Sequence, residues 1–378
     1  MLASEDGNQC LRVFMTVDAV GGVWQYALDL AEGLRAHGAE TTLAVLGPAP
    51  SADQQDRVEA AGIRLIYTGL PLEWIADAPA EVEEAGRSIA RMAAHVGADI
   101  VHVNNPALAA SANHSAPVVA VCHSCVATWW QAVRGGLLPE EFVWRTDLVR
   151  KGYRAADKLL APTAAFAQAT VRAYGLAEQP VIVRNGRRIP QASADKLPAS
   201  CVFTAGRLWD EGKNVAAIDR AAARLSIPVL AAGPLHGPNG ASTEVRHVQA
   251  LGRLSDAEIV NHLGARPIFV SAARYEPFGL SVLEAAQAGC ALVLSDIPTF
   301  RELWEDAAVF VPPDDDGAIA GAVERLMRDR DMRRSLGDAA RSMASRYSIE
   351  AMSSGVMAVY SSLLSKQKPI PSAAGAAA

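Results

Sequence analysis

Short runs of apolar residues recur along the chain, each followed by a turn-forming stretch and then by a longer segment with helical periodicity. In the first half, such apolar runs occupy residues 12–16, 42–46, 64–67, 100–103, 118–121 and 158–161. Segments with helical periodicity, such as 23–37 and 81–96, lie between them. Buried strands that alternate with helices are typical of a parallel sheet covered on both faces. The first half is therefore predicted to form an α/β domain.

The same alternation starts again after a segment of different composition. Residues 189–200 hold two prolines and few large apolar side chains, which is typical of a linker between domains. Beyond the linker, strands are predicted at residues 201–205, 229–232, 268–271, 291–295 and 309–311. We therefore expect a first domain over 1–188, a second over 189–345 and a closing helix over 346–367. The closing helices, from about Met332 to Lys366, are expected to cross back and pack on the first domain. The tail, 368–378, is rich in Ala, Pro and Ser and is expected to be disordered.

Composition agrees with this division and excludes several classes of protein. A chain of 378 residues suits two domains, and half of its residues are hydrophobic. The net charge of −6 gives none of the basic excess that is typical of nucleic-acid binders. Five scattered cysteines fit a reducing compartment better than a disulfide framework. The acidic N-terminus is not typical of a signal peptide, so we expect a cytoplasmic protein.

The segment 268–289 carries the densest signal for a binding site. A buried strand is followed by a turn-rich stretch that contains Glu276, and then by a helix from Leu280 that carries Glu284 about one turn further on. Ligands of open α/β sheets bind beyond the carboxyl ends of the strands. The backbone N–H groups of Phe278, Gly279 and Leu280 lie at the helix start, where unpaired donors favour an anion or electron-rich oxygens.

Together, the two carboxylates and the helix start suit a ligand that is both polyhydroxylated and anionic, and a sugar nucleotide meets both conditions. A second interpretation is an exposed Glu in a loop and a Glu that only complements the helix dipole.

Two further loops could hold phosphate groups. Gly21 and Gly22 lie where the first strand is followed by a helix, although they do not complete a G-x-G-x-x-G fingerprint, and a plain tight turn is the alternative. Arg207 and Lys213 lie in the loop after the first strand of the second domain. Opposite charges about 4 Å apart near a protein surface attract by roughly 4 kcal/mol before desolvation. These two cations could therefore neutralise a diphosphate, and the alternative is a pair of surface charges.

Cys122, His123 and Cys125 follow the strand predicted at 118–121. The C-x-x-C spacing would suit a redox or zinc site, but no second pair of cysteines follows. His123 lies at the carboxyl end of a strand, where it either serves the site or caps the strand with one hydrogen bond. Trp129 and Trp130 follow, and their rings suit either stacking on a sugar or packing against a helix.

The run Glu276-Pro277-Phe278-Gly279-Leu280, with Glu284 after it, resembles the E-x7-E motif of the retaining family 4 glycosyltransferases. That family has the GT-B fold, in which two Rossmann-like domains face each other across a cleft and a C-terminal helix crosses back to the first domain. The resemblance implies that the N-terminal domain binds the acceptor and the C-terminal domain binds the nucleotide-sugar. It also implies that Glu276 and the amides of Phe278, Gly279 and Leu280 contact the donor sugar, and that Glu284 holds the ribose hydroxyls.

The resemblance extends to the other candidate residues. Arg207 and Lys213 correspond to the cations that bind the leaving diphosphate, although the lysine here lies one residue later than in the commonest pattern. Gly21 and Gly22 would face the phosphate and sugar, and His123 would lie near the reacting carbon. The donor base would pack near Leu251 and Arg253.

We therefore expect a hexosyltransferase that moves a sugar from a nucleotide-diphosphate donor, such as a UDP- or GDP-sugar, to a hydroxyl group of a glycan, a lipid-linked molecule or a small molecule. Retention at the anomeric centre is implied by the resemblance. No cofactor and no metal are expected, because Asp314, Asp315 and Asp316 are placed to cap a helix rather than to form a D-x-D site. A sugar-nucleotide epimerase, a phosphorylase and a non-catalytic hinged binding module are the alternatives. The donor base, the sugar, the acceptor and the oligomeric state are left open.

The segment 142–156 is predicted to be a helix and carries four basic residues, Arg145, Arg150, Lys151 and Arg154. Such a helix could meet anionic lipid, which would make the protein peripheral to a membrane. A solvated basic face is the other interpretation.

Overall fold

The computed structural model describes residues 10–188 and 200–365. The predicted tail at 368–378 lies outside the described residues, and so does the predicted linker apart from residue 200.

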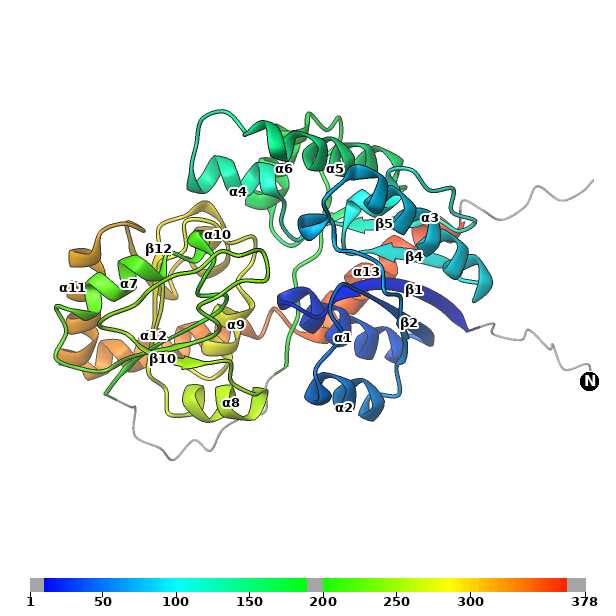
Figure 1. Ribbon diagram of the computed structural model, residues 1–378. Helices are drawn as coiled ribbons and strands as arrows, with labels where there is room; N and C mark the ends of the chain where they lie inside the picture. The colour runs from blue at the N-terminus through cyan, green and yellow to red at the C-terminus, as the bar shows by residue number, and fades with distance from the viewer. Residues whose placement is uncertain (1–9, 189–199, 366–378) are drawn as a thin grey trace, which may run out of the picture.

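The first domain is built on a sheet of seven parallel strands in the order β3-β2-β1-β4-β5-β6-β7 (Figure 1). The strands are β1 (Leu11–Asp18), β2 (Ala39–Leu46), β3 (Arg64–Tyr67), β4 (Ile100–Val103), β5 (Val118–Val121), β6 (Lys158–Ala161) and β7 (Val181–Ile182). Every residue of β4 and β5 is buried, as expected for central strands that helices cover on both faces. This arrangement explains why the central strands are continuous apolar runs.

Helices connect these strands and cover the sheet. The α-helices are α1 (Gly22–Ala36), α2 (Ala52–Ala60), α3 (Pro79–His95), α4 (Val126–Val133), α5 (Val143–Ala155) and α6 (Ala164–Tyr174), and the short 3-10 helices are η1 (Glu73–Ile75), η2 (Pro106–Ala109) and η3 (Glu140–Phe142). The β1–α1 connection is only three residues long, so the N-terminus of α1 lies directly at the carboxyl edge of the sheet.

The second domain repeats this architecture with six parallel strands in the order β10-β9-β8-β11-β12-β13. The strands are β8 (Val202–Ala205), β9 (Val229–Ala232), β10 (Gln249–Gly252), β11 (Ile268–Ser271), β12 (Leu292–Ser295) and β13 (Ala308–Val311). The helices are η4 (Glu211–Lys213), α7 (Val215–Ala222), α8 (Asp256–Gly264), α9 (Leu280–Gln287), α10 (Pro298–Trp304), α11 (Asp316–Arg328) and α12 (Arg330–Ala344). The predicted α/β fold with two parallel-sheet domains is therefore confirmed.

The last two helices take different paths. We expected the closing helices, from about residue 332, to cross back to the first domain, and for α12 this is wrong. α12 packs on α9 of the second domain, where Gly337 lies against Gly289 so closely that a Cβ atom would overlap the Gly289 carbonyl. The helix that crosses back is α13 (Ile349–Leu364), which lies along α1 (Figure 1).

α13 completes the core of the first domain. Its side chains Met352, Val356 and Tyr360 are buried in the same cluster as α1 and β1. The Tyr360 hydroxyl lies 2.7 Å from Nδ1 of the fully buried His102 on β4, so a polar side chain in the core has a hydrogen-bond partner. The first domain is therefore finished by residues from the far end of the chain.

Within the two described ranges, none of the helices combines the length and the apolar character that crossing a bilayer requires.

Candidate active site

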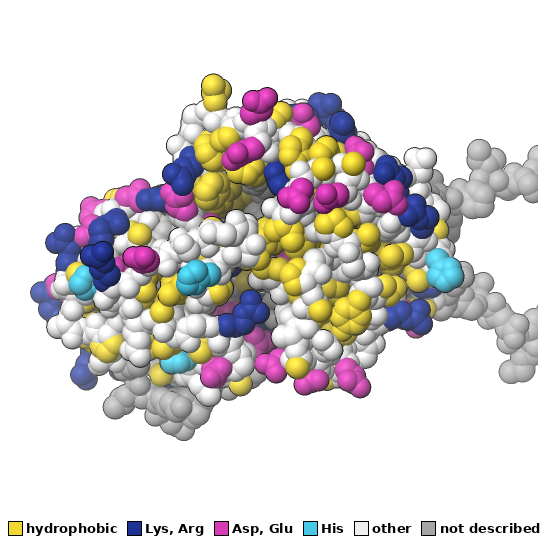
Figure 2. Space-filling model, in the orientation of Figure 1, with side chains coloured by type: hydrophobic (Ala, Val, Ile, Leu, Met, Phe, Trp, Pro, Cys, Tyr) yellow, Lys and Arg dark blue, Asp and Glu magenta, His cyan; other side chains and the backbone are white. Residues whose placement is uncertain are grey.

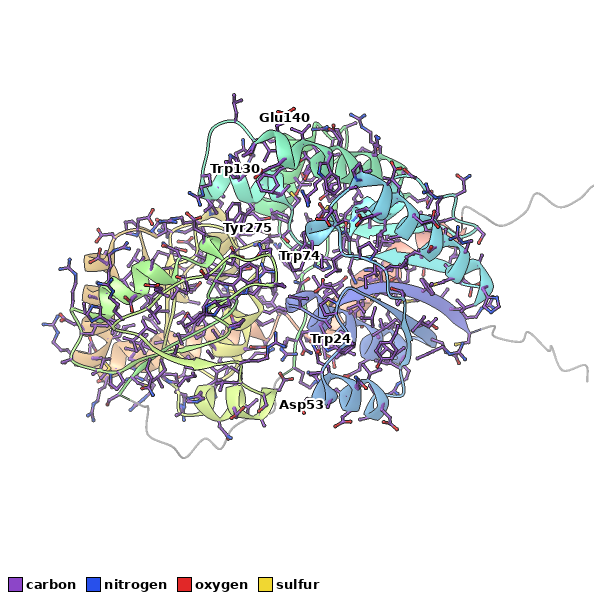
Figure 3. All side chains as sticks on the ribbon, viewed as in Figure 1. Trp24, Asp53, Trp74, Trp130, Glu140 and Tyr275 are labelled. Carbon is purple, nitrogen blue, oxygen red and sulfur yellow. The ribbon has the colours of Figure 1, made fainter. Side chains whose placement is uncertain are left out.

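A cleft of about 800 Å³ lies between the carboxyl ends of the two sheets. Its first-domain wall includes residues that follow β1, β4 and β5, and its second-domain wall includes residues that follow β8 and β11: Gly21, Gly22, Asn104, His123, Arg207, Asp210, Arg274 and Tyr275. Figure 2 shows the hollow between the two halves, and Figure 3 places Trp74 and Tyr275 between the domains. Open α/β sheets place their ligand sites at these edges.

The glycine pair at the start of α1 approaches both candidate loops of the second domain. A Cβ atom on Gly21 would lie 3.6 Å from Nη1 of Arg207, and one on Gly22 would lie 3.4 Å from Cδ1 of Leu280. Side chains at these positions would therefore fill the space between the domains at this point. The loops around Arg207 and Leu280 thus converge on the helix N-terminus that was predicted to face a phosphate.

Arg207 lines the cleft next to Asp210. Nη2 of Arg207 lies 3.0 Å from Oδ2 of Asp210, and the Arg207 guanidinium lies over the Trp209 ring. Burial raises the pKa of Asp210, but Arg207, Lys213 and the hydrogen bonds from Trp129 and Gly212 together lower it more, so the net shift is downward. Asp210 also accepts hydrogen bonds from Gly212 N at 2.9 Å and from Nε1 of Trp129, across the cleft, at 3.0 Å. An ionised Asp210 therefore holds the loop that carries both predicted cations.

Lys213 is not among the residues that line the cleft; it forms an ion pair with Glu276. Glu276 lies after β11, which is the neighbour of β8 in the sheet, so the two loops adjoin. Oε1 of Glu276 also accepts from the Phe278 N–H at 3.5 Å. The predicted cation and the first predicted carboxylate therefore neutralise each other in this structure.

The start of α9 has the geometry that its sequence predicts. Gly279 is the N-cap residue with φ of 91°, a left-handed conformation that favours glycine. Phe278 is buried, and its ring packs edge-on against Tyr347. Leu280 begins the helix and reaches toward Gly22 of the first domain. The Phe278 side chain thus anchors the turn, while the backbone of the turn approaches the start of α1.

Glu284 forms an ion pair with a residue that sequence reasoning missed. Arg187, at the end of the first domain, contacts Glu284 on α9 through Nε, and its Nη1 lies 3.2 Å from Oδ2 of Asp29 on α1. Only 7% of the Arg187 side chain is exposed. Burial raises the pKa of Asp29 to about 6, and Arg187 opposes that rise. Arg187 thus links the second predicted carboxylate to the core of the first domain. The only sequence signal was a pair of arginines after the Asn185-Gly186 turn.

His123 is held by a second missed residue, Asn104. Nε2 of His123 lies 2.8 Å from Oδ1 of Asn104, and Nδ2 of Asn104 donates to the backbone carbonyl of Thr16 at 2.7 Å. Because the amide must present its NH2 group to Thr16, its oxygen faces His123, and Nε2 of His123 carries the proton. Burial lowers the pKa of His123 to about 3, so at neutral pH the imidazole is uncharged and Nδ1 is a hydrogen-bond acceptor.

Leu251 and Arg253 lie apart from the other candidates. Leu251 is in β10, an edge strand of the second sheet, and Arg253 follows it and is exposed. Neither residue lines the cleft.

The cysteine pair shows no sign of thiolate chemistry. Burial raises the pKa of Cys122 to about 12 and also raises the pKa of Cys125, and both thiols are free. Sγ of Cys125 lies 2.9 Å from the Thr128 hydroxyl, so the C-x-x-C segment is part of the packing at the start of α4. Within the described residues, three or more His, Cys, Asp or Glu side chains are nowhere grouped so that they could hold a metal ion.

The predicted N-cap in the aspartate triplet is confirmed. Oδ1 of Asp315 accepts from the Ala318 N–H at 2.8 Å at the start of α11. Asp314 pairs with Arg274 at 2.6 Å, and Asp316 pairs with Arg224 at 2.7 Å. Each of the three carboxylates therefore has a structural partner.

Two parallel sheets that face each other across a cleft, with cations and carboxylates on the loops of the second sheet, define the GT-B class of fold. The family model for Glycosyltransferase Family 4 matches residues 20–188, and the family model for Glycosyl transferases group 1 matches residues 241–343. The chain belongs to the family 4 glycosyltransferases and is an enzyme of that family.

Individual relatives agree with this assignment. The chain is 27% identical to the phosphatidyl-myo-inositol mannosyltransferase of Mycolicibacterium smegmatis, over 91% of this chain and 90% of that protein. It is 26% identical to the alpha-D-kanosaminyltransferase of Streptomyces kanamyceticus, over 60% of this chain and 56% of that protein. These relatives are transferases, so the alternatives of an epimerase, a phosphorylase or a binding module are not favoured.

Solved structures share the fold. Sucrose-phosphate synthase from Thermosynechococcus elongatus matches with a TM-score of 0.76 at 18% identity, over 94% of this chain and 100% of that one. Anabaena HepE in complex with UDP-glucose matches with a TM-score of 0.71 at 19% identity, over 93% of this chain and 100% of that one.

Proposed function

We propose that this enzyme transfers a hexosyl group from a nucleotide-diphosphate sugar to an acceptor hydroxyl group, with retention at the anomeric centre and without a metal ion or another cofactor. The donor lies at the junction of the second-domain loops with the start of α1, and the acceptor enters from the first-domain side. The observation that carries this proposal is the convergence of Arg207 and Leu280 on the glycine pair Gly21-Gly22.

The diphosphate is the natural occupant of that junction. The N-terminus of α1 offers unpaired backbone N–H groups, and Arg207 places a cation within reach of the same point. Negative charge grows on the leaving diphosphate during transfer, so a fixed cation and helix dipole stabilise the transition state more than the ground state. This arrangement supplies the stabilisation for which some transferases use a divalent ion.

Lys213 and Glu276 exchange partners when the donor binds. In the ligand-free protein each neutralises the other. A diphosphate beside Lys213 replaces Glu276 as its partner, and the released carboxylate accepts hydrogen bonds from hydroxyl groups of the donor sugar. The amides of Phe278, Gly279 and Leu280 complete the contact with that sugar.

Glu284 binds the ribose hydroxyls in this proposal, and His123 lies beside the reacting carbon as a neutral imidazole. The base is placed toward Leu251 and Arg253 by the resemblance alone, because these residues lie outside the cleft described above. Two of the relatives are named as a mannosyltransferase and a kanosaminyltransferase, which supports transfer of a hexose unit. HepE, which has the same fold, was solved with UDP-glucose, and this supports a nucleotide-sugar donor.

The proposed setting is the cytoplasm, which the scattered free cysteines support. Contact with a membrane through the basic helix α5 has less support. Arg145 of that helix bonds to backbone carbonyls inside the domain, and Arg150 pairs with Asp147.

Replacement of Arg207 tests the proposal. Turnover of a UDP- or GDP-sugar, measured as nucleotide release and sugar transfer in excess EDTA, should be retained by the native protein and should fall about a hundredfold or more in Arg207→Ala. The control is Arg224→Ala, which removes an exposed cation that pairs with Asp316 and should change the rate less than twofold. A loss of native activity in EDTA that magnesium restores would contradict the metal-free mechanism. A near-normal rate in Arg207→Ala would contradict the diphosphate site.

A further inference from the structure

The first-domain side of the cleft contains a surface that is not part of the proposed donor site. It is formed by η1, η2, η3 and the start of α5, and we call it the acceptor wall. The acceptor wall consists of Leu72, Glu73, Trp74, Asn105, Phe142 and Arg145. Its composition limits the kind of molecule that can receive the sugar.

The cations on this side of the cleft are already engaged. Among the described residues that line the first-domain side, the Lys and Arg residues are Arg134 and Arg145. Arg134 forms an ion pair at 2.6 Å with Glu211 of the second domain. Arg145 donates to the backbone carbonyls of Glu73 at 3.3 Å, Ala76 at 2.6 Å and Glu141 at 3.2 Å.

The Arg145 guanidinium also lies over the Trp144 ring, with 4.3 Å between its Cζ and the ring centroid. Three of its five N–H donors therefore hold η1 and η3 together, and its charge acts on the nearby carboxyl group of Glu73. A phosphate placed on the acceptor wall would lose its water without gaining a free cation, which is unfavourable.

The polar groups of the acceptor wall suit a hydroxyl group instead. Oδ1 of Asn105 accepts from the Ala107 N–H at 3.0 Å, which leaves the NH2 group of the Asn105 side chain to donate to Glu73. Burial raises the pKa of Glu73 to about 7, and Arg145 and Asn105 oppose the rise. A carboxyl group that holds or releases a proton near neutral pH can donate to or accept from a hydroxyl group, and it repels an anion when ionised.

The remaining area of the acceptor wall is apolar. Trp74 and Phe142 present aromatic rings, and Leu72 is buried beside them. Trp129, whose Nε1 is bonded to Asp210, adds a third ring to the cleft. Figure 2 shows hydrophobic side chains gathered along the upper edge of the hollow. Flat aromatic surfaces bind planar apolar groups and the C–H faces of sugar rings.

We propose that the acceptor is an uncharged molecule that carries its reacting hydroxyl group beside an apolar ring or hydrocarbon face, and that acceptors with a phosphate near that hydroxyl group are disfavoured. This inference rests on the proposed function, because it takes the donor to occupy the junction at Gly21 and Arg207. It distinguishes this chain from an enzyme whose acceptor wall offers an unpaired arginine or lysine to a phosphate.

Matched pairs of acceptors test the inference. With whichever of UDP-glucose and GDP-mannose the protein turns over, kcat/KM is measured by mass spectrometry for methylumbelliferyl glucoside against methyl glucoside, and for myo-inositol against inositol 1-phosphate. We expect at least a tenfold preference for the aromatic glucoside and at least a tenfold preference for the unphosphorylated inositol. Preference for the phosphorylated member, or no transfer to any neutral acceptor while the donor is turned over, would overturn the inference.

Two variants connect the preference to the acceptor wall. Trp74→Ala should bring the ratio between the two glucosides to within about twofold of one. Glu73→Lys should raise the relative rate with inositol 1-phosphate about tenfold, because it supplies a cation where the native protein has a carboxyl group. The matched control for the first variant is Tyr67→Ala, which removes an aromatic ring that is 54% exposed and lies outside the cleft, and the ratio should not change. Unchanged ratios in both wall variants would place the acceptor elsewhere.

The acceptor assay also distinguishes a failure of this inference from a failure of the proposed function. A protein that neither binds nor turns over any UDP- or GDP-sugar contradicts the proposed function itself. A protein that turns over the donor but prefers the phosphorylated acceptor contradicts only the assignment of the acceptor.

Discussion

At the scale of single residues, the state of His123 is decided by an amide that sequence reasoning did not consider. Asn104 follows β4 and is fixed by two contacts with Thr16: its N–H donates to the Thr16 hydroxyl at 3.0 Å and its NH2 group donates to the Thr16 carbonyl at 2.7 Å. The Tyr26 ring packs edge-on against His123 with a centroid separation of 4.5 Å. His123 therefore has one ring orientation and one tautomer, and Asn104 is a positioning residue for it.

Asn104→Asp should change the pH dependence of the reaction. A carboxylate beside the imidazole favours its charged form, so the pKa of His123 rises from about 3. As the pH falls through this raised pKa, Nδ1 becomes protonated and can no longer accept a hydrogen bond. We expect kcat/KM for the donor to fall between pH 7 and pH 5 in the variant and to stay level in the native protein.

The control is Asn261→Asp, which makes the same chemical change at an exposed position on α8. A variant with a uniformly reduced rate and an unchanged pH profile would show that Asn104 has only a structural role.

The residues predicted from sequence and those that sequence reasoning missed differ in one physical respect. Glu276, Glu284 and Arg207 stand in local patterns of strand, loop and helix, and such patterns can be recognised from neighbours along the chain. Asn104 and Arg187 act through contacts with residues that are distant in sequence: Thr16 is 88 positions from Asn104, and Asp29 is 158 positions from Arg187. A contact between residues so far apart along the chain produces no periodicity or compositional bias that sequence analysis can detect.

At the scale of elements, short strands were the most predictable part of the fold. The runs at 64–67, 100–103, 118–121, 229–232 and 268–271 have the bounds of β3, β4, β5, β9 and β11. Each is a run of four residues of which at least three are apolar, which favours a short strand.

Two helices, α2 and α10, were not predicted, for different reasons. α2 has one buried residue, Val58, so its sequence shows no helical periodicity, although the capping box of Ser51 and Gln54 was a usable signal. α10 does have an apolar stripe, with Phe300, Leu303 and Trp304 buried, but it is short and begins at a proline, Pro298. The N–H groups of the first helical turn have no partner within the helix. Proline, which lacks an N–H group, therefore also suits a helix start.

The packing of α13 on α1 depends on a glycine within a helix. A Cβ atom on Gly33 would lie 2.7 Å from Cβ of Ser353 and 2.8 Å from Cγ2 of Ile349. Ordinary contacts between carbon atoms are 3.5 to 4 Å long, so a methyl group at this position forces the two helices apart.

Gly33→Ala should therefore destabilise the protein by about 1–3 kcal/mol, even though alanine is the better helix former. The matched control is Gly321→Ala in α11, where no atom lies within 4 Å of the new methyl group. The free energy of unfolding of that variant should rise by about 0.5–1 kcal/mol. Urea unfolding of the two variants measures the difference, and equal shifts in the same direction would show that Gly33 does not set the helix separation.

At the scale of the whole molecule, Arg187 joins the two domains. It lies at the end of the first domain and pairs with Asp29 on α1 and with Glu284 on α9 of the second domain. Asp29 and Glu284 are largely buried, with 4% and 13% of their side chains exposed. Loss of the arginine would leave two carboxylates buried without their cation.

Arg187→Met should destabilise the protein by about 3–5 kcal/mol, as expected when one member of a buried ionic cluster is removed. Arg188→Met is the control at the next position. Its side chain is 69% exposed and pairs with Glu350 at the surface, so it should cost at most about 1 kcal/mol. Chemical denaturation with and without the nucleotide-sugar measures both. If the two variants were equally stable, the cluster would not connect the domains energetically.

The described residues that end the first domain lie next to those at which the chain returns from the second domain to α13. The Arg187 N–H donates to the Tyr347 carbonyl at 3.2 Å, and a Cβ atom on Gly186 would overlap the carbonyl of Ser348. The described ends of the outgoing and returning segments are thus fixed to each other at the N-terminus of α13. A rotation of one domain relative to the other about this point would move the residues nearest to it least and the cleft residues farthest from it most.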